Sequence, residues 1–288
     1  MKFTNPGFEE LKYDNQLLLG ERCTRVCYKS EDKISDGSAK KLLTGIINSG
    51  HTAMIEHISV YMKIAEDRFN DIIDFNDIID LENPILKIVF SPYTKYVIWE
   101  GEMFISTNLR VIYDADRTMV DEYMENNGER FMFTCGLYNC KFTDYPEYFY
   151  RRVTILFTMD RIGSQSFCRH RTFSFAQEST RWCNYVREKF GSEISIITPC
   201  WLKEEDTEEY EQDMKVAENL YFKWLEKGYK AEEARAFLPF GLKTEIVMTG
   251  FVDAWEHFFE LRSDKHAHSQ ARELSIPLEE YFKENNYL

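Results

Sequence analysis

Residues 161–187 read RIGSQSFCRHRTFSFAQESTRWCNYVR, and their charge is opposite to that of the whole protein. The stretch holds five arginines, no lysine and one acid, Glu178, whereas the 288-residue chain has a formal net charge of −14. Arginine recognises phosphate or carboxylate through a planar pair of donors, which lysine lacks. The stretch is therefore predicted to bind an anionic ligand. Structural salt bridges to acidic neighbours are the alternative interpretation.

The same stretch is predicted to pass from a helix into an extended segment. Residues 159–171 have a helical pattern, with Asp160 near the start and basic residues at the end, where the helix dipole favours cations. In an extended continuation, Gln177, Ser179 and Arg181 would project from one face. The amide suits a polar base or sugar, and the hydroxyl and guanidinium suit a phosphate. The spacing therefore favours a pyrimidine monophosphate.

Strand and helix patterns alternate along the rest of the chain. Strands are predicted where β-branched and alternating residues occur, at 58–64, 86–91, 95–100, 103–113 and 152–157. Helices are predicted at 37–48, from about 205 onward, at 244–261 with Thr244 as N-cap, and at 265–275. These elements indicate an α+β fold with a mostly antiparallel sheet flanked by helices. Because no linker stands out, residues 1–288 are expected to form a single domain.

Composition excludes several classes of protein. The chain has no signal-peptide pattern and no apolar run long enough to cross a bilayer, so we expect no membrane partner. Seven scattered cysteines without a C-x-x-C pair indicate reduced thiols and a cytoplasmic location. The net charge of −14 opposes general nucleic-acid binding.

The six histidines are confined to three short segments, which suggests that these segments converge on one site. They are His51, His57, His170, His257, His266 and His268. A metal-dependent hydrolase is one interpretation, but the H-x5-H and H-x-H spacings are not recognised helical ligand pairs. The excess of arginine would also repel a cation. We therefore expect no metal site.

Arg169-His170-Arg171, followed by seven residues and then Ser179, resembles the R-H-R-x7-S signature of the flavin-dependent thymidylate synthases. Two flanking segments resemble the same family. Gly50-His51 with Glu56-His57 is similar to its N-terminal G-H-x4-E-H element, and its C-terminal block is matched by Ala234-Arg235, Leu238-Pro239, Thr244, Leu261-Arg262 and His266-Ala267-His268. The resemblance covers roughly 20–60 and 150–275, and about 65–150 is interpreted as an elaboration of the sheet.

The resemblance implies a flavin-dependent thymidylate synthase-like fold and a homotetramer whose active sites are shared between subunits. It implies reductive methylation of deoxyuridine monophosphate (dUMP) to thymidylate (dTMP). Methylenetetrahydrofolate would give the carbon, and FAD with NADPH would give the reducing electrons. Such an enzyme needs mainly placement and charge from the protein, because the flavin carries the redox chemistry.

Site roles follow from the resemblance position by position. The residues that would hold FAD are His51, Glu56, Arg169, His170, Arg171, His257 and His266. Those that would hold dUMP are Gln177, Ser179, Arg181, Arg235 and Arg262, with either Gln165 or Ser166 as a further contact. Arg262 and Ser179 are the expected catalytic residues, since a fixed positive charge beside the pyrimidine would stabilise negative charge on the ring.

The chain also departs from the family pattern. Many members carry Asn-x-Arg, facing flavin, where this chain has Phe251-Val252-Asp253. Cys27 stands where Ser is frequent, and Trp182 replaces a Tyr. These changes leave a second hypothesis open, namely a nucleotide- or RNA-binding protein of the same fold with impaired or lost flavin chemistry.

Overall fold

The computed structural model describes residues 1–65, 83–128, 132–135, 138–142, 150–186 and 190–288. Its contacts separate into two compact units. The first comprises residues 1–11, 24–31 and 154–288, and the second comprises 12–23 and 32–153. Helix α1 (Gln16–Tyr28) contributes residues to both units. The single domain over 1–288 stays a prediction, and Arg187 lies outside the described residues.

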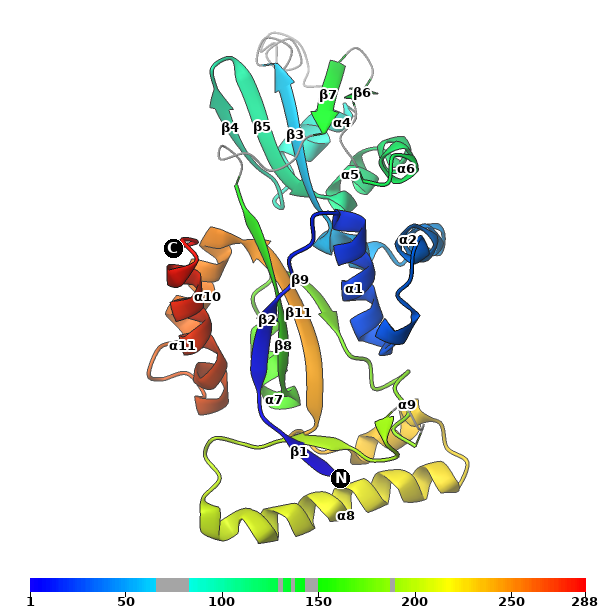
Figure 1. Ribbon diagram of the computed structural model, residues 1–288, viewed down its shortest axis with the longest axis vertical. Coiled ribbons are helices and arrows are strands. Elements are labelled where there is room, and N and C mark those ends of the chain that lie inside the picture. The colour runs from blue at the N-terminus through cyan, green and yellow to red at the C-terminus, as the bar shows by residue number, and fades with distance from the viewer. Residues whose placement is uncertain (66–82, 129–131, 136–137, 143–149, 187–189) are drawn as a thin grey trace. The chain divides into compact units, whose positions relative to one another are not determined.

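A four-stranded sheet forms the centre of the first unit. Its strands lie in the order β2 (Gly7–Glu10), β8 (Arg152–Asp160), β11 (Lys243–Phe251) and β9 (Ser174–Gln177) (Figure 1). The pairs β2–β8 and β9–β11 are antiparallel. Helices α10 (Val252–Arg262) and α11 (Ser269–Glu284) lie side by side along this sheet. The predicted α+β class, with antiparallel strands and flanking helices, is confirmed.

Aromatic rings join the sheet to α7 (Arg161–Phe167) and α10. Phe167 lies 4.8 Å from Phe258 and 5.1 Å from Phe157 between ring centroids. The ring of Phe173, two residues after Arg171, lies 4.6 Å from that of Trp255 between centroids. A Cβ at Gly250 would come within 2.5 Å of the Phe173 ring, so the bare backbone there makes room for it. The segment between α7 and β9 is thus anchored at both ends by buried rings.

A smaller sheet in the first unit pairs β1 (Lys2–Thr4) with β10 (Ser195–Ile197) in parallel. The short helices η4 (Glu204–Asp206), α9 (Ala231–Ala234) and η5 (Arg235–Phe237) flank the long α8 (Thr207–Glu226). Helix α8 buries Tyr221 in a cluster with Ile194, Ile196 and Leu242. Its acidic start is exposed, as expected for a solvated first turn.

The second unit contains a five-stranded sheet in the order β4 (Lys95–Trp99), β5 (Glu102–Asn108), β3 (Ser59–Ala65), β7 (Tyr138–Phe142) and β6 (Met132–Cys135). All of its neighbouring strands are antiparallel. The unit also holds α2 (Ser38–Asn48), η2 (Thr52–His57), α4 (Pro84–Val89), α5 (Leu109–Ala115) and α6 (Arg117–Glu125). The 3-10 turn η1 (Glu31–Lys33) lies at its boundary with the first unit. The predicted helix at 37–48 and the strands at 58–64 and 95–100 are confirmed.

Two predicted strands in this unit are wrong because side chains start helices there. The Asn83 side chain accepts a hydrogen bond from Ile85 N at 2.9 Å, and Pro84 follows it, so 84–89 is helix α4. Asn108 accepts from Arg110 N at 3.0 Å and from Val111 N at 3.1 Å. The strand predicted at 103–113 therefore ends at Asn108.

The helix predicted at 244–261 is also wrong in its first half. Residues 243–251 form strand β11, and helix α10 begins only at Val252. Residues 246–251 are all buried, because both faces of this strand are covered. A fully buried run has no alternation to distinguish a strand from a helix. The strand predicted at 152–157 is confirmed and extends to Asp160, while the last helix, predicted at 265–275, runs from Ser269 to Glu284.

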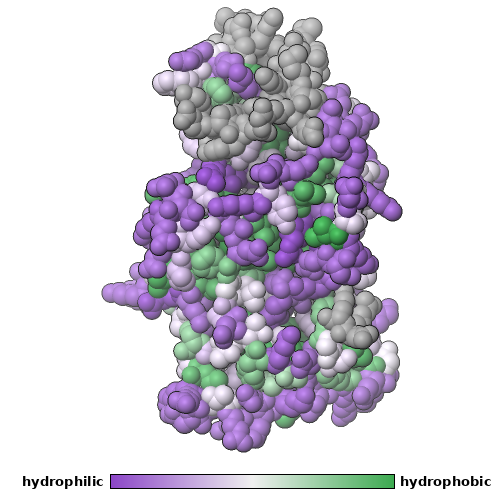
Figure 2. Space-filling view, in the orientation of Figure 1, coloured by the Kyte–Doolittle hydropathy of each residue, from purple (hydrophilic) through white to green (hydrophobic). Residues whose placement is uncertain are grey.

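The face shown in Figure 2 is covered largely by hydrophilic residues, with hydrophobic residues scattered among them. This distribution matches a chain of which 29% of the residues are charged. Within the described ranges, no helix combines the length and the apolar character needed to cross a membrane.

Candidate functional site

Helix α7 ends at Phe167, two residues before Arg169, so Arg169 and Arg171 follow its carboxyl end. Asp160 caps the helix start, where its Oδ1 accepts from Gly163 N at 2.6 Å. The helix is thus shorter than the predicted 159–171. Two tight turns follow, since His170 N donates to Phe167 O and Phe173 N donates to His170 O, each at 3.1 Å. The cations therefore lie beyond the negative end of the helix dipole, as predicted.

Arg169 and Arg171 are both exposed on this turn. Neither side chain makes a hydrogen bond or an ion pair with any residue in the described part of the chain. Structural salt bridges therefore do not account for these two arginines. In a protein with a net charge of −14, these two exposed and unpaired guanidiniums on one turn are a candidate anion site.

His170, between the two arginines, is buried and faces inward. Its Nε2 accepts a hydrogen bond from Arg262 Nε at 2.9 Å. Its ring packs edge-on against Phe258, with centroids 5.1 Å apart. Burial, together with Arg262 and His257, lowers the pKa of His170 to about 4. The imidazole is therefore neutral at physiological pH.

Arg262 is the last residue of α10 and is half-buried. Besides its bond to His170, its Nη2 donates to Ser166 O of α7 at 2.7 Å. Burial and the nearby Arg169 lower the pKa of Arg262 below its ordinary value. No described acidic residue pairs with it. Arg262 and Ser166, both predicted nucleotide contacts, are thus in direct contact through the Ser166 carbonyl.

Gln177 ends β9 and is held by two hydroxyls that the sequence did not single out as site residues. Its Nε2 donates to Ser164 Oγ at 2.8 Å and to Thr244 Oγ1 at 3.3 Å. Thr244, predicted as a helix N-cap, lies instead in β11, paired with β9. Because both amide protons of Gln177 are engaged, its amide oxygen is the atom that can accept a hydrogen bond from a ligand.

Ser179 and Arg181 do not continue the strand, so the predicted shared face of Gln177, Ser179 and Arg181 is wrong. Strand β9 ends at Gln177, and Ser179 O accepts from Trp182 N at 3.1 Å and from Cys183 N at 2.9 Å in a turn. Ser179 N donates to Cys27 O at 3.0 Å, which fixes the turn. The physical reason is that the chain leaves β11 after Glu178, whose N still donates to Glu245 O at 2.9 Å, because the next residue, Ser179, is tied to Cys27 O instead.

Arg181 is the one predicted phosphate contact with an acidic partner. Its guanidinium lies 3.4 Å from Glu232 Oε2 of α9, and both side chains are largely exposed. Arg235 follows α9 directly and is exposed. An exposed ion pair at this distance contributes little to stability, so Arg181 remains available to a ligand.

Other predicted residues lie apart from this cluster. Gln165 is exposed on α7. His257 pairs with Glu260 at 3.1 Å but lies 6.2 Å from His170 between ring centroids. His266 is 80% exposed and lies 2.8 Å from Asp264.

His51 and Glu56 belong to the second unit, so their part in a flavin site stays a prediction. Glu56 lines a cavity of about 350 Å³ with Lys87, Asn108 and Arg110. Buried Arg152 donates to Glu56 O at 3.0 Å, and burial lowers the pKa of Arg152 to about 10.

A charge network around buried Glu178, next to the Ser179 turn, was not predicted from the sequence. Glu178 is 2% exposed and accepts from Tyr185 at 3.1 Å, while Lys243 lies 3.4 Å from Glu178 and 2.6 Å from Glu245. Lys29 also pairs with Glu245. Glu178 is the single acid among residues 161–187. This feature of the sequence could have indicated that Glu178 has a structural role.

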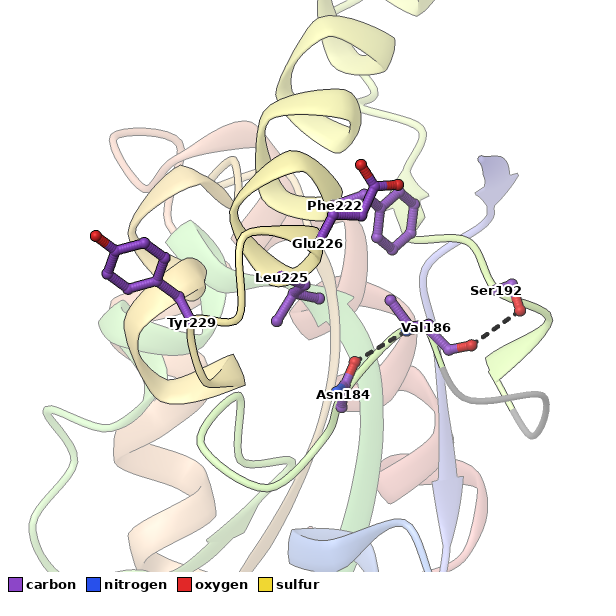
Figure 3. Close-up of a pocket in the computed structure, with 7 residues that line it drawn as sticks. All are labelled: Asn184, Val186, Ser192, Phe222, Leu225, Glu226 and Tyr229. Carbon is purple, nitrogen blue, oxygen red and sulfur yellow. Dashed lines mark hydrogen bonds between the residues drawn. The ribbon is translucent and has the colours of Figure 1, made fainter.

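A second cavity, of about 410 Å³, lies in the first unit between the end of α8 and the residues Asn184, Val186 and Ser192 (Figure 3). One side of the cavity is lined by Phe222, Leu225 and Tyr229, from the end of α8 and the turn after it. On the other side, Asn184 Oδ1 accepts a hydrogen bond from Val186 N at 3.1 Å. None of the predicted site residues lines it. Among the described residues, no group of three or more His, Cys, Asp or Glu side chains is arranged to hold a metal ion.

Residues 151–285, just under half of the chain, match the family model described as thymidylate synthase complementing protein. This part of the chain is thus similar to that family. The match includes α7, the arginine turn, β9, β11 and Arg262. The matched range therefore contains Arg169, Arg171 and Arg262.

Curated relatives named flavin-dependent thymidylate synthase are similar to the chain over a comparable length. One from Pyrococcus furiosus is 34% identical over 118 residues, 40% of this chain and 47% of the relative. One from Sulfurisphaera tokodaii is 31% identical over 125 residues, 43% and 47% of the two chains. One from Synechocystis is 26% identical over 144 residues, 45% and 65%. The chain thus spans about half the length of the first curated relatives it matches.

Proposed function

We propose that this protein is a cytoplasmic flavin-dependent thymidylate synthase that methylates dUMP to dTMP, with the flavin-dependent thymidylate synthase-like fold. One observation carries the proposal: in an acidic chain, Arg169 and Arg171 have no acidic partner among the described residues, and Arg262 is held beside them by a neutral His170. The match of residues 151–285 to the family model supports it.

The residues of the arginine turn fit FAD. Two exposed guanidiniums on a turn suit its paired phosphates, because Arg binds phosphate oxygens through two donors at once. Arg169 and Arg171 would hold that part of the cofactor, and His51, Glu56, His257 and His266 are proposed as further contacts. Bound FAD would supply the reducing hydride, with NADPH as the source of its electrons.

The nucleotide is proposed to bind between the end of α7, the Ser179 turn and Arg262. Arg181, Arg235 and the Ser179 hydroxyl would hold the phosphate, and the amide oxygen of Gln177 would accept from the base or sugar, with Gln165 or Ser166 beside it. Arg262 would stabilise negative charge on the pyrimidine as C5 loses its proton and takes the one-carbon unit of methylenetetrahydrofolate. A homotetramer with shared sites belongs to the same proposal.

Loss of flavin chemistry is a second candidate, favoured by Asp253, an exposed acid in the first turn of α10, the helix that ends at Arg262. The companion change, Phe251, is buried at the end of β11, where its ring fills the core. Binding of dUMP by a protein that cannot be loaded with FAD would favour this candidate over the enzyme.

Arg181→Ala is expected to weaken dUMP binding about ten- to a hundredfold and to leave FAD bound, since a charge-assisted phosphate contact contributes about 1.5–3 kcal/mol. Arg171→Ala is expected to do the reverse. Calorimetric titration of each ligand into each variant measures both effects. Equal loss of both ligands in each variant would contradict this division of roles.

Glu232→Gln is the matched control, because it removes only the acidic partner of Arg181. If Arg181 serves the phosphate, this variant should bind dUMP at least as well as the wild type. If the ion pair is merely structural, Glu232→Gln and Arg181→Ala should lower dUMP affinity alike.

A further inference from the structure

Two of the three nitrogens of the Arg262 guanidinium are already engaged within the protein. Nε donates to His170 Nε2 at 2.9 Å, and Nη2 donates to Ser166 O at 2.7 Å. No described residue hydrogen-bonds Nη1. The planar group is therefore fixed along one edge, and Nη1 is the nitrogen with both of its hydrogens left for a ligand.

The two acceptors come from the same short stretch of chain. Ser166 O is among the last four carbonyls of α7, which have no partner within their own helix. His170 lies in the turn that follows. The end of α7 and the turn after it thus hold the end of α10, because Ser166 O and His170 Nε2 both accept hydrogen bonds from Arg262.

The direction of the His170 hydrogen bond defines its protonation. Arg262 Nε–H can only donate, so His170 Nε2 must carry a lone pair and no proton. The neutral ring then has its proton on Nδ1. Protonation of Nε2 would bring two donors face to face and would break the contact.

The ring of His170 has little freedom to turn away from this arrangement. It is 7% exposed and packs against Phe258 and Phe173, with centroids 5.1 and 6.2 Å away. His257 approaches to 6.2 Å on another side. Burial opposes protonation of the ring and lowers its pKa, as do the Arg262 charge and His257. No acidic side chain that would favour the imidazolium contacts the ring in the described part of the unit.

We propose that His170 is a positioning residue of the nucleotide site, which in its Nδ1–H form orients Arg262 so that Nη1 is presented to the pyrimidine. This role rests on the proposed function. In this role His170 orients the guanidinium of Arg262, in addition to making the flavin contact that the R-H-R resemblance implies. The shared residue would couple the flavin turn to the substrate site.

Two substitutions separate hydrogen bonding from packing. His170→Phe keeps an aromatic ring against Phe258 but offers no acceptor to Arg262. His170→Gln places an amide oxygen near the position of Nε2 and can still accept. We expect His170→Phe to weaken dUMP binding about tenfold and His170→Gln to stay within about threefold of the wild type. Equal weakening in both variants would overturn the proposal.

A double-mutant cycle with Arg262→Ala tests whether His170 acts through Arg262. In the Arg262→Ala background, His170→Phe should cause no further loss of dUMP affinity. Additive losses would mean that His170 affects the site by another route, and would overturn the positioning role.

The tautomer can be measured without any ligand, on full-length protein labelled with ¹⁵N-histidine, with His170→Gln identifying the signal. Nuclear magnetic resonance should show His170 protonated on Nδ1 at neutral pH, and that form should persist until the pH approaches 4. A proton on Nε2, or an imidazolium at neutral pH, would overturn the proposal. If wild-type protein binds no dUMP, the proposed function fails, while the tautomer still reports on the His170–Arg262 contact.

Discussion

Arg262→Ala is expected to reduce release of tritium from C5 of bound dUMP by about a hundred- to a thousandfold, the effect of removing a preorganised donor that stabilises transition-state charge. The guanidinium is held on one edge by His170 and Ser166 O and has no acidic partner within the described residues. The charge of Arg262 would stabilise the pyrimidine ring mainly in the transition state, as negative charge develops on it. The turnover rate should therefore fall more than the affinity for dUMP.

Arg262→Lys should recover little of this loss. A lysine carries the charge but has neither a planar fork nor a donor at the position of Nε, so it cannot keep both internal bonds and present a third donor. Cys200→Ala is the control, because Cys200 is exposed and its hydrogen-bond partners are Ser269 and Glu273. Tritium release should survive this control. Its loss in Cys200→Ala, with both ligands bound, would point to a thiolate mechanism instead.

Lys243→Met is expected to destabilise the protein by about 3–5 kcal/mol, a large part of the stability of a typical domain. The Lys243 ammonium lies between two carboxylates, that of buried Glu178 and that of the partly buried Glu245. Its removal would leave Glu178 without a cation in ion-pair distance among the described residues. Urea unfolding measures the loss. Lys203→Met is the control, since Lys203 is 70% exposed and lies 4.0 Å from Glu205; it should change stability by about 0.5 kcal/mol or less.

The same network predicts how stability depends on pH. Burial opposes the charge on Glu245, but Lys243 and Lys29 outweigh it and lower the pKa of Glu245 below 4.5. Its contribution is present above pH 4.5 and is lost as the pH falls through the lowered value. Burial is likewise outweighed at Lys243, where Glu178 and Glu245 raise the pKa above 10.5. Its contribution is present below pH 10.5 and is lost as the pH rises further. Lys243→Met should flatten the alkaline limb, and an unchanged limb would contradict this assignment.

The features that could be predicted from the sequence depend on residues close together in the chain. Five arginines in 161–187 stood out against the acidic remainder, and two of them, Arg169 and Arg171, proved to have no internal partner in the described part of the chain. The Asp160 cap and the strand that precedes it were also visible, because a capping residue and an alternating run act over a few neighbours.

Contacts between distant residues could not be predicted in the same way. His170 and Arg262 are 92 residues apart, and Glu178 and Lys243 are 65 apart. Their pairing depends on how α7, β9 and β11 pack, which no local pattern encodes. Strand β11 is a related case, since its buried run acquires its strand identity from β9 and β8. The turn at Ser179 likewise depends on Cys27, which reaches it from the far end of the chain.

The absorbance spectrum of the purified protein, after loading with excess FAD and removal of the free cofactor, tests whether the arginine turn is a flavin site. Arg169 and Arg171 should retain the cofactor, so the protein should be yellow and show a flavin spectrum. Arg171→Ala, loaded in the same way, should retain much less. A colourless wild-type protein would contradict the flavin site and, with it, the proposed thymidylate synthase activity.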